Sequence, residues 1–254
     1  MQSIATSTKS HNHKSLSVLI HQDGLSFYIH TTDQILSAIN KQFKHSSNPI
    51  EILKSVEDCF AKESELNQDF DQVKLIYHHD IFTLVPKELF KESHAADYLK
   101  YNTRLLQTDT LSVDEELSDT GANLVYVAYS NINNYFYEKY GSYSYFHYSA
   151  LVLQQLGKLG DGLFIEVMPS HFYLTIYKEG KLIAHNLFQH EQIEDILFYT
   201  LYAAEQNQLD PELFRLTIIQ EVQDQELFDL LYTYVREVSF IPNYSDYLNH
   251  LVCA

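Results

Sequence analysis

The sequence predicts a mixed α/β fold in two halves, each built from strands that alternate with helices. Segments of alternating apolar and polar residues, such as HFYLTIYK (171–178), are followed by segments with helical spacing of apolar residues, such as EQIEDILFYTLYAAEQ (191–206). Hydrophobic residues make up 45% of the 254-residue chain and charged residues 20%, the balance of a globular protein. Both halves also begin alike, with a hairpin of alternating strands.

The second half shows this pattern most clearly. Three strands are expected to form an antiparallel meander, at 162–168, 171–178 and 181–188. Gly180 lies in the tight turn KEGK between the last two strands. The helix at 191–206 comes next, and the remaining elements follow in the order strand, helix, strand, at 215–220, 225–235 and 237–242. Strands that alternate with helices in this way indicate a mixed sheet with the meander at one side.

The first half opens with strands at 16–20 and 25–30, joined by the hairpin signal QDG. A helix is expected directly afterwards, with a cap at Thr32 or Asp33 and an apolar stripe formed by Ile35, Leu36, Ile39 and Phe43. Further helices are expected at 50–62, after Pro86, at 132–141 and at 150–159. Further strands are expected at 73–79, 81–86, 122–130 and 144–149.

Composition changes along the chain suggest its organisation. Residues 1–14 read as a disordered tail without the apolar core of a signal peptide. The glycine-rich stretch GKLGDG (157–162) indicates a boundary, which places one lobe at 15–160 and a second at 161–254. Its glycines follow a helix and precede a strand, the reverse of a dinucleotide fingerprint. The acidic stretch 108–121 is expected to be an inserted loop.

The charge balance excludes two classes of partner. The chain carries 34 Asp and Glu against 17 Lys and Arg, a formal charge of −17 at pH 7. Such a surface repels phosphate backbones and anionic lipid, so we expect no nucleic-acid partner and no membrane insertion. No apolar run approaches the roughly 20 residues that span a bilayer. Because Cys59 and Cys253 are too few for a disulfide framework, we expect cytoplasmic residence.

A β-meander followed by α/β units, occurring twice in one chain, resembles the actin-like ATPase fold, which is ribonuclease H-like. KEGKLIAHNL (178–187) looks like the second turn and third strand of that fold, and LSVLIHQDGLSFYI (16–29) is similar to a small family of uncharacterised bacterial proteins. The likeness covers residues 15 to about 250. It implies a duplicated fold of two lobes, each with a mixed, five-stranded sheet that starts in a meander or hairpin and is flanked by helices.

The turn after the first strand of each half bears on nucleotide chemistry. In active members of the superfamily this turn binds phosphate through backbone N–H groups, with glycine allowing close approach and an acidic residue organising the metal. In the second half the turn reads EVMPSH (166–171). Glu166 stands where the acid belongs, but no glycine follows it, and Pro169 has no N–H to donate.

The corresponding turn of the first half reads IHQDGL (20–25). His21 stands at the position of the acid, and an Asp-Gly pair between alternating strands is typical of a plain hairpin turn. We therefore expect no cofactor. If the chain is instead a divergent ATPase, ATP and Mg²⁺ would bind near Asp23, Gly24, Glu166 and Ser170.

Other motifs give two further expectations. In HHD (78–80), neighbouring residues of a strand point to opposite faces, so no metal site is expected there. The aromatic run 134–148 carries few cations, unlike a surface that stacks nucleic-acid bases. Because tyrosine is enriched at interface hot spots, the run predicts a protein-binding patch formed by Tyr135, Tyr137, Tyr140, Tyr143 and Tyr145.

Three functions remain open at this point. The favoured hypothesis is a non-catalytic binding or scaffold protein that keeps the architecture of a nucleotide enzyme and lacks its phosphate loops. Its partner would be another protein or a second copy of the chain. The first alternative is a divergent ATP-binding ATPase or kinase. The second is an enzyme that acts on a small molecule without ATP. A fold by itself does not choose among them, because function resides in sites.

Overall fold

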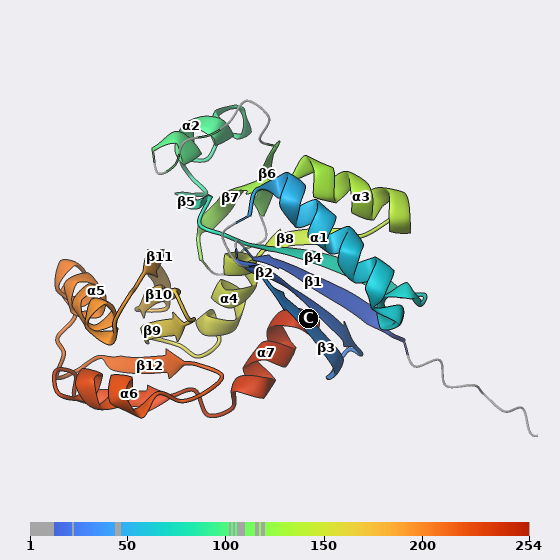
Figure 1. Ribbon diagram of the computed structural model, residues 1–254. Coiled ribbons are helices and arrows are strands. Elements are labelled where there is room, and N and C mark those ends of the chain that lie inside the picture. Colours follow the sequence, from blue (N-terminus) through green and yellow to red (C-terminus); the bar gives the residue numbers. More distant parts are fainter. Residues whose placement is uncertain are drawn as a thin grey trace, which may run out of the picture.

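The computed structural model describes residues 13–21, 23–43, 47–101, 103, 105, 110–114, 117 and 120–253. Its described part contains two five-stranded sheets and a three-stranded sheet, with helices around them (Figure 1). The two larger sheets have equivalent strand orders. When the strands of each sheet are numbered along the chain, the order across the sheet is third, second, first, fourth and fifth. The predicted tail falls outside the described residues except for His13 and Lys14.

The first sheet has the order β3-β2-β1-β4-β8. Its strands are β1 (Ser15–His21), β2 (Gly24–His30), β3 (Ile35–Gln42), β4 (Gln72–His78) and β8 (Ser144–His147). β1, β2 and β3 form an antiparallel meander, whereas β4 and β8 extend the sheet in parallel. β1 and β4 lie at the centre and are almost wholly buried, as expected of parallel strands covered on both faces.

β3 corrects the helix that the sequence predicted at this position. Its burial alternates strictly along the strand: Ile35, Ser37 and Ile39 are half-buried, and the residues between them are exposed. Two of the apolar residues expected in the helical stripe, Ile35 and Ile39, are four residues apart, a spacing that fits one face of a strand as well as one face of a helix. Pairing with β2 decided between them. Each half therefore opens with a three-stranded meander.

Three helices pack around the first sheet: α1 (Pro49–Lys62), α3 (Ser130–Tyr140) and α4 (Tyr148–Gly157). The start of α1 is fixed by a capping box. The Asn48 side chain accepts from the backbone N–H of Glu51 at 3.1 Å, and the Glu51 carboxylate accepts from the Asn48 N–H at 3.2 Å. The short 3₁₀ turn η1 (Ser64–Asn67) follows α1 and leads into β4.

A small sheet with the order β5-β7-β6 is inserted between β4 and α3 (Figure 1). Its strands are β5 (Phe82–Pro86), β6 (Thr110–Asp114) and β7 (Ala122–Ala128), all antiparallel. β6 corrects the expectation that 108–121 is only a loop. Helical structure after Pro86 begins later than predicted, at η2 (Glu92–His94) and α2 (Ala95–Lys100).

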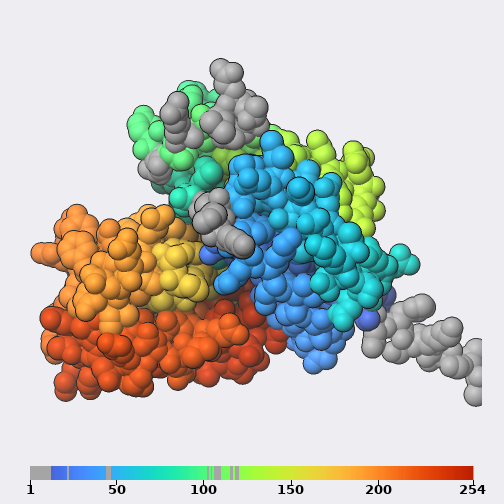
Figure 2. All heavy atoms as spheres, viewed as in Figure 1, coloured from blue at the N-terminus to red at the C-terminus, as the bar shows by residue number. Residues whose placement is uncertain are grey.

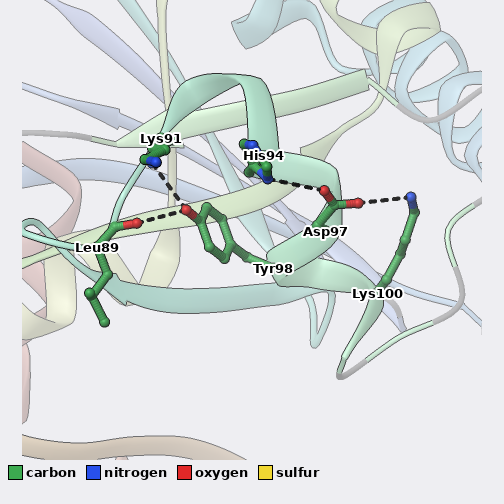
Figure 3. Close-up of polar contacts among 6 residues, drawn as sticks. All are labelled: Leu89, Lys91, His94, Asp97, Tyr98 and Lys100. Atoms are coloured by element: carbon green, nitrogen blue, oxygen red, sulfur yellow. Dashed lines mark hydrogen bonds and ion pairs between the residues drawn. The ribbon is translucent and has the colours of Figure 1, made fainter.

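Side-chain contacts hold α2 to the segment that follows β5 (Figure 3). The Tyr98 hydroxyl donates to the Leu89 carbonyl at 2.8 Å and accepts from the Lys91 N–H at 3.1 Å. Asp97 lies between His94 and Lys100, with Nδ1 of His94 at 3.4 Å and Nζ of Lys100 at 3.2 Å. The inserted sheet also has its own small core, centred on Val85, Leu99 and Val125.

The second sheet has the order β11-β10-β9-β12-β13. Its strands are β9 (Gly162–Val167), β10 (His171–Lys178), β11 (Lys181–Gln189), β12 (Arg215–Ile219) and β13 (Glu237–Phe240), and its helices are α5 (Ile193–Gln206) and α6 (Gln225–Tyr232). The predicted meander and the predicted tight turn are confirmed. Glu179 and Gly180 both have positive φ, and their N–H groups donate to the Asp161 carboxylate at 2.7 and 2.8 Å.

The alternation along β10 divides its side chains between two cores. Phe172 and Leu174 contribute to the core shared with α5 and α6, whereas Tyr173 and Tyr177 belong to the core that continues into the first sheet. The Tyr177 hydroxyl donates to the Leu153 carbonyl of α4 at 2.9 Å. α4 thus connects the two sheets through buried contacts.

The last helix, α7 (Tyr244–Cys253), was not predicted from the sequence, and it packs against β1 and α4 (Figure 1). The buried Ser17 hydroxyl of β1 donates to the Val252 carbonyl at 2.6 Å. Asn249 accepts from the Ile35 N–H at the edge of β3 at 3.2 Å. The chain therefore returns to the first sheet after completing the second. The division into lobes at residues 160 and 161 stays a prediction.

Candidate functional site

The candidate site lies where the first strands of the two sheets end. β1 and β4 run parallel and end together, with His21 and His78 as register partners. β9 and β12 also run parallel, and Glu166 and Ile219 are the last register partners of this pair. In open α/β sheets, ligands bind outside the carboxyl ends of the parallel strands. The turns that follow β1 and β9 are also the two turns that the sequence singled out.

Three histidines from the two sheets meet at this position. Nδ1 of His21 and Nδ1 of His78 are 2.7 Å apart, a distance at which one ring donates a hydrogen bond to the other. The ring of His171, from the start of β10, lies 5.5 Å from that of His78, centroid to centroid. Burial lowers the pKa of His21 to about 4 and that of His78 well below the ordinary value of 6.5. The rings are therefore neutral at pH 7.

Two tyrosines enclose His78. The ring of Tyr148, at the start of α4, stacks on His78 at 4.2 Å, and the ring of Tyr173, from β10, stacks on it at 5.5 Å. Both interplanar angles are 22°. Because α4 holds Tyr148 and the second sheet holds Tyr173, the stack joins the two parts of the molecule through aromatic contact.

Glu166 is the buried carboxyl group of the site. It is 3% exposed, and the Tyr148 hydroxyl donates to its Oε1 at 2.5 Å. Burial raises the pKa of Glu166 from 4.5 to about 7, although hydrogen bonds from tyrosine oppose this effect. Burial, and then the nearby Glu166 carboxylate, raise the pKa of Tyr148 and of Tyr247 from α7 well above 10.

A second group of rings continues from Tyr173. His185 of β11 stacks on Tyr173 at 5.3 Å with an interplanar angle of 10°, and its Nδ1 lies 2.9 Å from the Thr175 hydroxyl. Phe82 of β5 lies 5.7 Å from His185 and 4.7 Å from His147. Burial lowers the pKa of His185 to about 3. The candidate site is thus one face of a ring cluster that reaches the inserted sheet.

The residues chosen from the sequence lie at the two turns but have different surroundings. Asp23 is exposed, and its carbonyl accepts from the Phe43 N–H at 2.7 Å. Gly24 is buried, and a Cβ added there would lie 2.7 Å from the Lys41 carbonyl oxygen of β3. Gly24 is therefore needed for the close approach of β3. Ser170 is exposed, and its hydroxyl lies 3.2 Å from Nδ1 of His171.

The predicted tyrosine patch divides between core and surface. Tyr135, Tyr140 and Tyr143 pack partly buried against the core near Phe136. Tyr137 is 65% exposed and Tyr145 is 37% exposed. Protein binding by this patch stays a prediction.

Sequence reasoning missed the ring contacts around Glu166. His78 was considered only for metal ligation, and Tyr148 only as the end of an aromatic run. One signal did exist, because His78 and His21 both stand at the ends of strands that a parallel pairing brings together. The stack with Tyr173 depends on how the second sheet packs against α4.

Among the described residues, no group of three or more His, Cys, Asp or Glu side chains could hold a metal ion.

Solved structures identify the class of this fold. A Bacteroides thetaiotaomicron protein described as having an actin-like ATPase fold and unknown function superimposes with a TM-score of 0.82, at 21% identity over 99% of this chain and 100% of that one. The ethanolamine utilization protein EutJ from Carboxydothermus hydrogenoformans gives 0.54, at 7% identity over 94% and 89%. A structure of the PilM–PilN type IV pilus biogenesis complex gives 0.53, at 11% identity over 91% and 88%. The chain has the duplicated actin-like ATPase fold.

Within this class, the chain belongs to the family described as protein of unknown function (DUF3822), whose model matches residues 4–238. No curated protein matches the sequence. Within the described part of the chain, no helix is both long enough and apolar enough to span a membrane.

Proposed function

We propose that this protein is a cytoplasmic, non-catalytic binding protein in which the phosphate position of actin-like ATPases has become a neutral aromatic contact between the two sheets. The observation that carries this proposal is the state of Glu166. The carboxyl group that stands at the acidic position of the second half is buried and bonded to Tyr148. Two free cysteines, Cys59 and Cys253, support the location.

The electrostatics of the site do not fit a magnesium nucleotide. A carboxylate that organises Mg²⁺ is ionised and reaches the ion or its water ligands. Glu166 is largely shielded from water, with its pKa raised to about 7. His21 stands at the acidic position of the first half, and burial lowers its pKa to about 4. Near pH 7, Glu166 is therefore only partly ionised and His21 is neutral.

The backbone of the two turns supports the same proposal. The turn after β9 contains Pro169, which has no N–H, and its Met168 N–H already donates to the His171 carbonyl at 3.0 Å. In the first turn, Gly24 allows the approach of β3. Phosphate cradles need several free N–H groups pointing at one oxygen cluster. In these turns Gly24 serves the approach of β3 and the Met168 N–H is already paired.

Exposed aromatic side chains support a protein as the partner. Tyr137 and Tyr145 lie partly in solvent, and Phe198 and Tyr202 of α5 stack on one another at 6.0 Å although they are 62% and 52% exposed. Large exposed aromatic side chains are enriched where proteins bind one another.

Thermal unfolding with and without millimolar Mg-ATP, Mg-ADP or AMP tests the proposal. A ligand that binds only the folded chain raises Tm by mass action. We expect no shift with any of the three. An upward shift that is lost in Asp23→Ala would overturn the proposal and make the chain a divergent ATPase or kinase. Asp23 is exposed, so its replacement leaves the core intact.

A further inference from the structure

We propose that the groove between β5 and β11 binds an extended segment of another protein, which adds as a strand to the outer edge of β11. This inference rests on the proposed function, since it names the partner of a binding protein. Strand addition derives its affinity from main-chain hydrogen bonds and its specificity from pockets for alternate side chains.

The groove has a volume of about 740 Å³ and lies between the inserted sheet and the second sheet. β5 and β11 face one another in Figure 1, and the green and orange segments adjoin on this side of the molecule in Figure 2. Both walls are edge strands, because in the described part of the chain β5 pairs only with β7 and β11 only with β10. The lining residues are Asp80, Phe82, Thr83, Leu84, Pro86, Thr120, Gly121, Ala122 and 182–187.

β11 is the edge best suited to accept a strand. It has nine residues, whereas the edge strands β8 and β13 have four each. β5 has five residues and ends in Pro86, which lacks an N–H. At the edge of β3, the Ile35 N–H is already bonded to Asn249. Proteins protect edge strands with proline, charge, bulges or short length; β11 has one bulge, at Ile183, and a single charged residue, Lys181, at its start.

The walls define the chemistry of the bound segment. Leu84, Ile183 and Leu187 offer apolar contacts on both sides. Asp80 is the charged residue of the lining, which contains no Lys or Arg. An extended segment facing β5 needs about five residues, at about 3.3 Å per residue. We therefore expect a neutral or basic segment with alternating apolar side chains. A second copy of the chain fits less well, because two bodies of formal charge −17 repel one another.

His185 supplies an independent indication. Its side chain lines the groove, is 6% exposed, and is fixed by Thr175 at Nδ1. Its Nε2 has no hydrogen-bond partner in the part of the chain that the structure describes. Buried polar groups of this kind are almost always paired. Because this atom is shielded from solvent, a carbonyl of the bound segment would reach it only after the His185 ring turns toward the groove.

The test uses a phage-displayed library of random linear seven-residue peptides, selected against the full chain. We expect selected peptides that bind the wild-type chain and lose about tenfold or more in affinity, about 1.4 kcal/mol, for Ile183→Lys. Replacing alternate amides of the same peptides with N-methyl amides removes donors and keeps the side chains, so it should abolish binding. Fluorescence anisotropy measures each affinity.

The matched control is Leu36→Lys on β3. Leu36 and Ile183 are both 44% exposed on edge strands of the two larger sheets, so the two substitutions should have similar effects on stability. Peptide binding should survive Leu36→Lys. Failure to select any binder, or binders indifferent to Ile183→Lys or to N-methylation, overturns the inference. The inference is also overturned if light scattering shows a dimer that the Ile183→Lys substitution dissociates. Thermal unfolding with nucleotides tests the proposed function separately, and its result does not depend on any of these outcomes.

Discussion

Glu166 shows how one buried group can make stability depend on pH. Its pKa is raised from 4.5 to about 7, so the folded chain holds this proton more tightly than the unfolded chain. The group contributes its full stability below pH 4.5 and loses it as pH rises to about 7. From 2.5 pH units at 1.36 kcal/mol each, the loss is about 3 kcal/mol.

The variant Glu166→Gln should remove this dependence, because an amide does not titrate. We expect the variant to gain about 3 kcal/mol relative to wild type between pH 4.5 and pH 8. Urea unfolding at both pH values measures the difference. Glu205→Gln, at an exposed position of α5, is the control and should show no such change. A difference that stays constant with pH would contradict the buried state of Glu166.

Tyr148→Phe addresses the donor to this carboxyl group. The variant keeps the ring that stacks on His78 and removes the hydroxyl that donates to Glu166. A buried acceptor without its donor costs about 1–3 kcal/mol, and more when the carboxyl group is ionised. Unfolding free energies should therefore fall, and fall further at pH 8 than at pH 5. Tyr137→Phe, at an exposed position, should change stability by less than about 0.5 kcal/mol.

At the scale of elements, two glycines should respond oppositely to the same substitution. In Gly24→Ala the new Cβ would lie 2.7 Å from the Lys41 carbonyl oxygen, so β2 and β3 must separate. We expect a loss of about 1–3 kcal/mol. In Gly157→Ala, at the end of α4, the Cβ would meet the Tyr177 hydroxyl at an ordinary 3.5 Å, and alanine favours the helix by about 0.5–1 kcal/mol. Thermal melts of both variants show whether each substitution raises or lowers Tm. A higher Tm for Gly24→Ala would refute the close approach of β3.

The elements also show what sequence patterns can and cannot predict. Strong alternation, as in β10, led to a correct element, whereas the cap expected at Thr32 or Asp33 belonged to a helix that is the strand β3 in the structure. β3 was misread because Ile35 and Ile39 fit a strand as well as a helix, and only pairing with β2 distinguishes the two. α7 was missed although its buried residues Tyr247 and Leu251 lie four residues apart, the spacing of one helix face.

For the candidate site, the sequence pointed to Glu166 and to the two turns. The turns could be located because they follow β1 and β9, the first strands of the two larger sheets. The sequence did not reveal the stack of Tyr148, His78 and Tyr173, because their 95-residue span closes only when the second sheet packs on α4. Turn chemistry is local and can be read from neighbouring residues. Ring stacking between sheets depends on tertiary packing, for which a single sequence carries no periodic signal.

At the scale of the whole molecule, buried histidines should make the chain sensitive to acid. Burial lowers the pKa of six described histidines, His21, His30, His78, His147, His171 and His185. A lowered folded pKa means that the unfolded chain binds more protons between about pH 6.5 and the folded value. Stability is then complete above pH 6.5 and is lost as pH falls.

Two carboxyl groups oppose this trend, Glu166 and Asp114, whose pKa burial raises to about 6. Because six groups outweigh two, we expect Tm to fall between pH 7 and pH 5. Calorimetry in buffers of equal ionic strength measures the trend. A Tm that rises over this interval would mean that the buried histidines do not outweigh the two carboxyl groups.

The return of α7 has a mechanical consequence. The chain passes from the first sheet to the second at 158–161 and comes back at 241–243, ahead of the helix that packs on β1. Two bodies joined at two points cannot pivot freely. Any rotation of the second sheet and its helices relative to the first is therefore confined to an axis that passes through both connections. After a cut at 158–161, α7 would still hold the second sheet to the first through contacts such as Ser17–Val252. After a cut at 241–243, the two sheets would still be joined through 158–161.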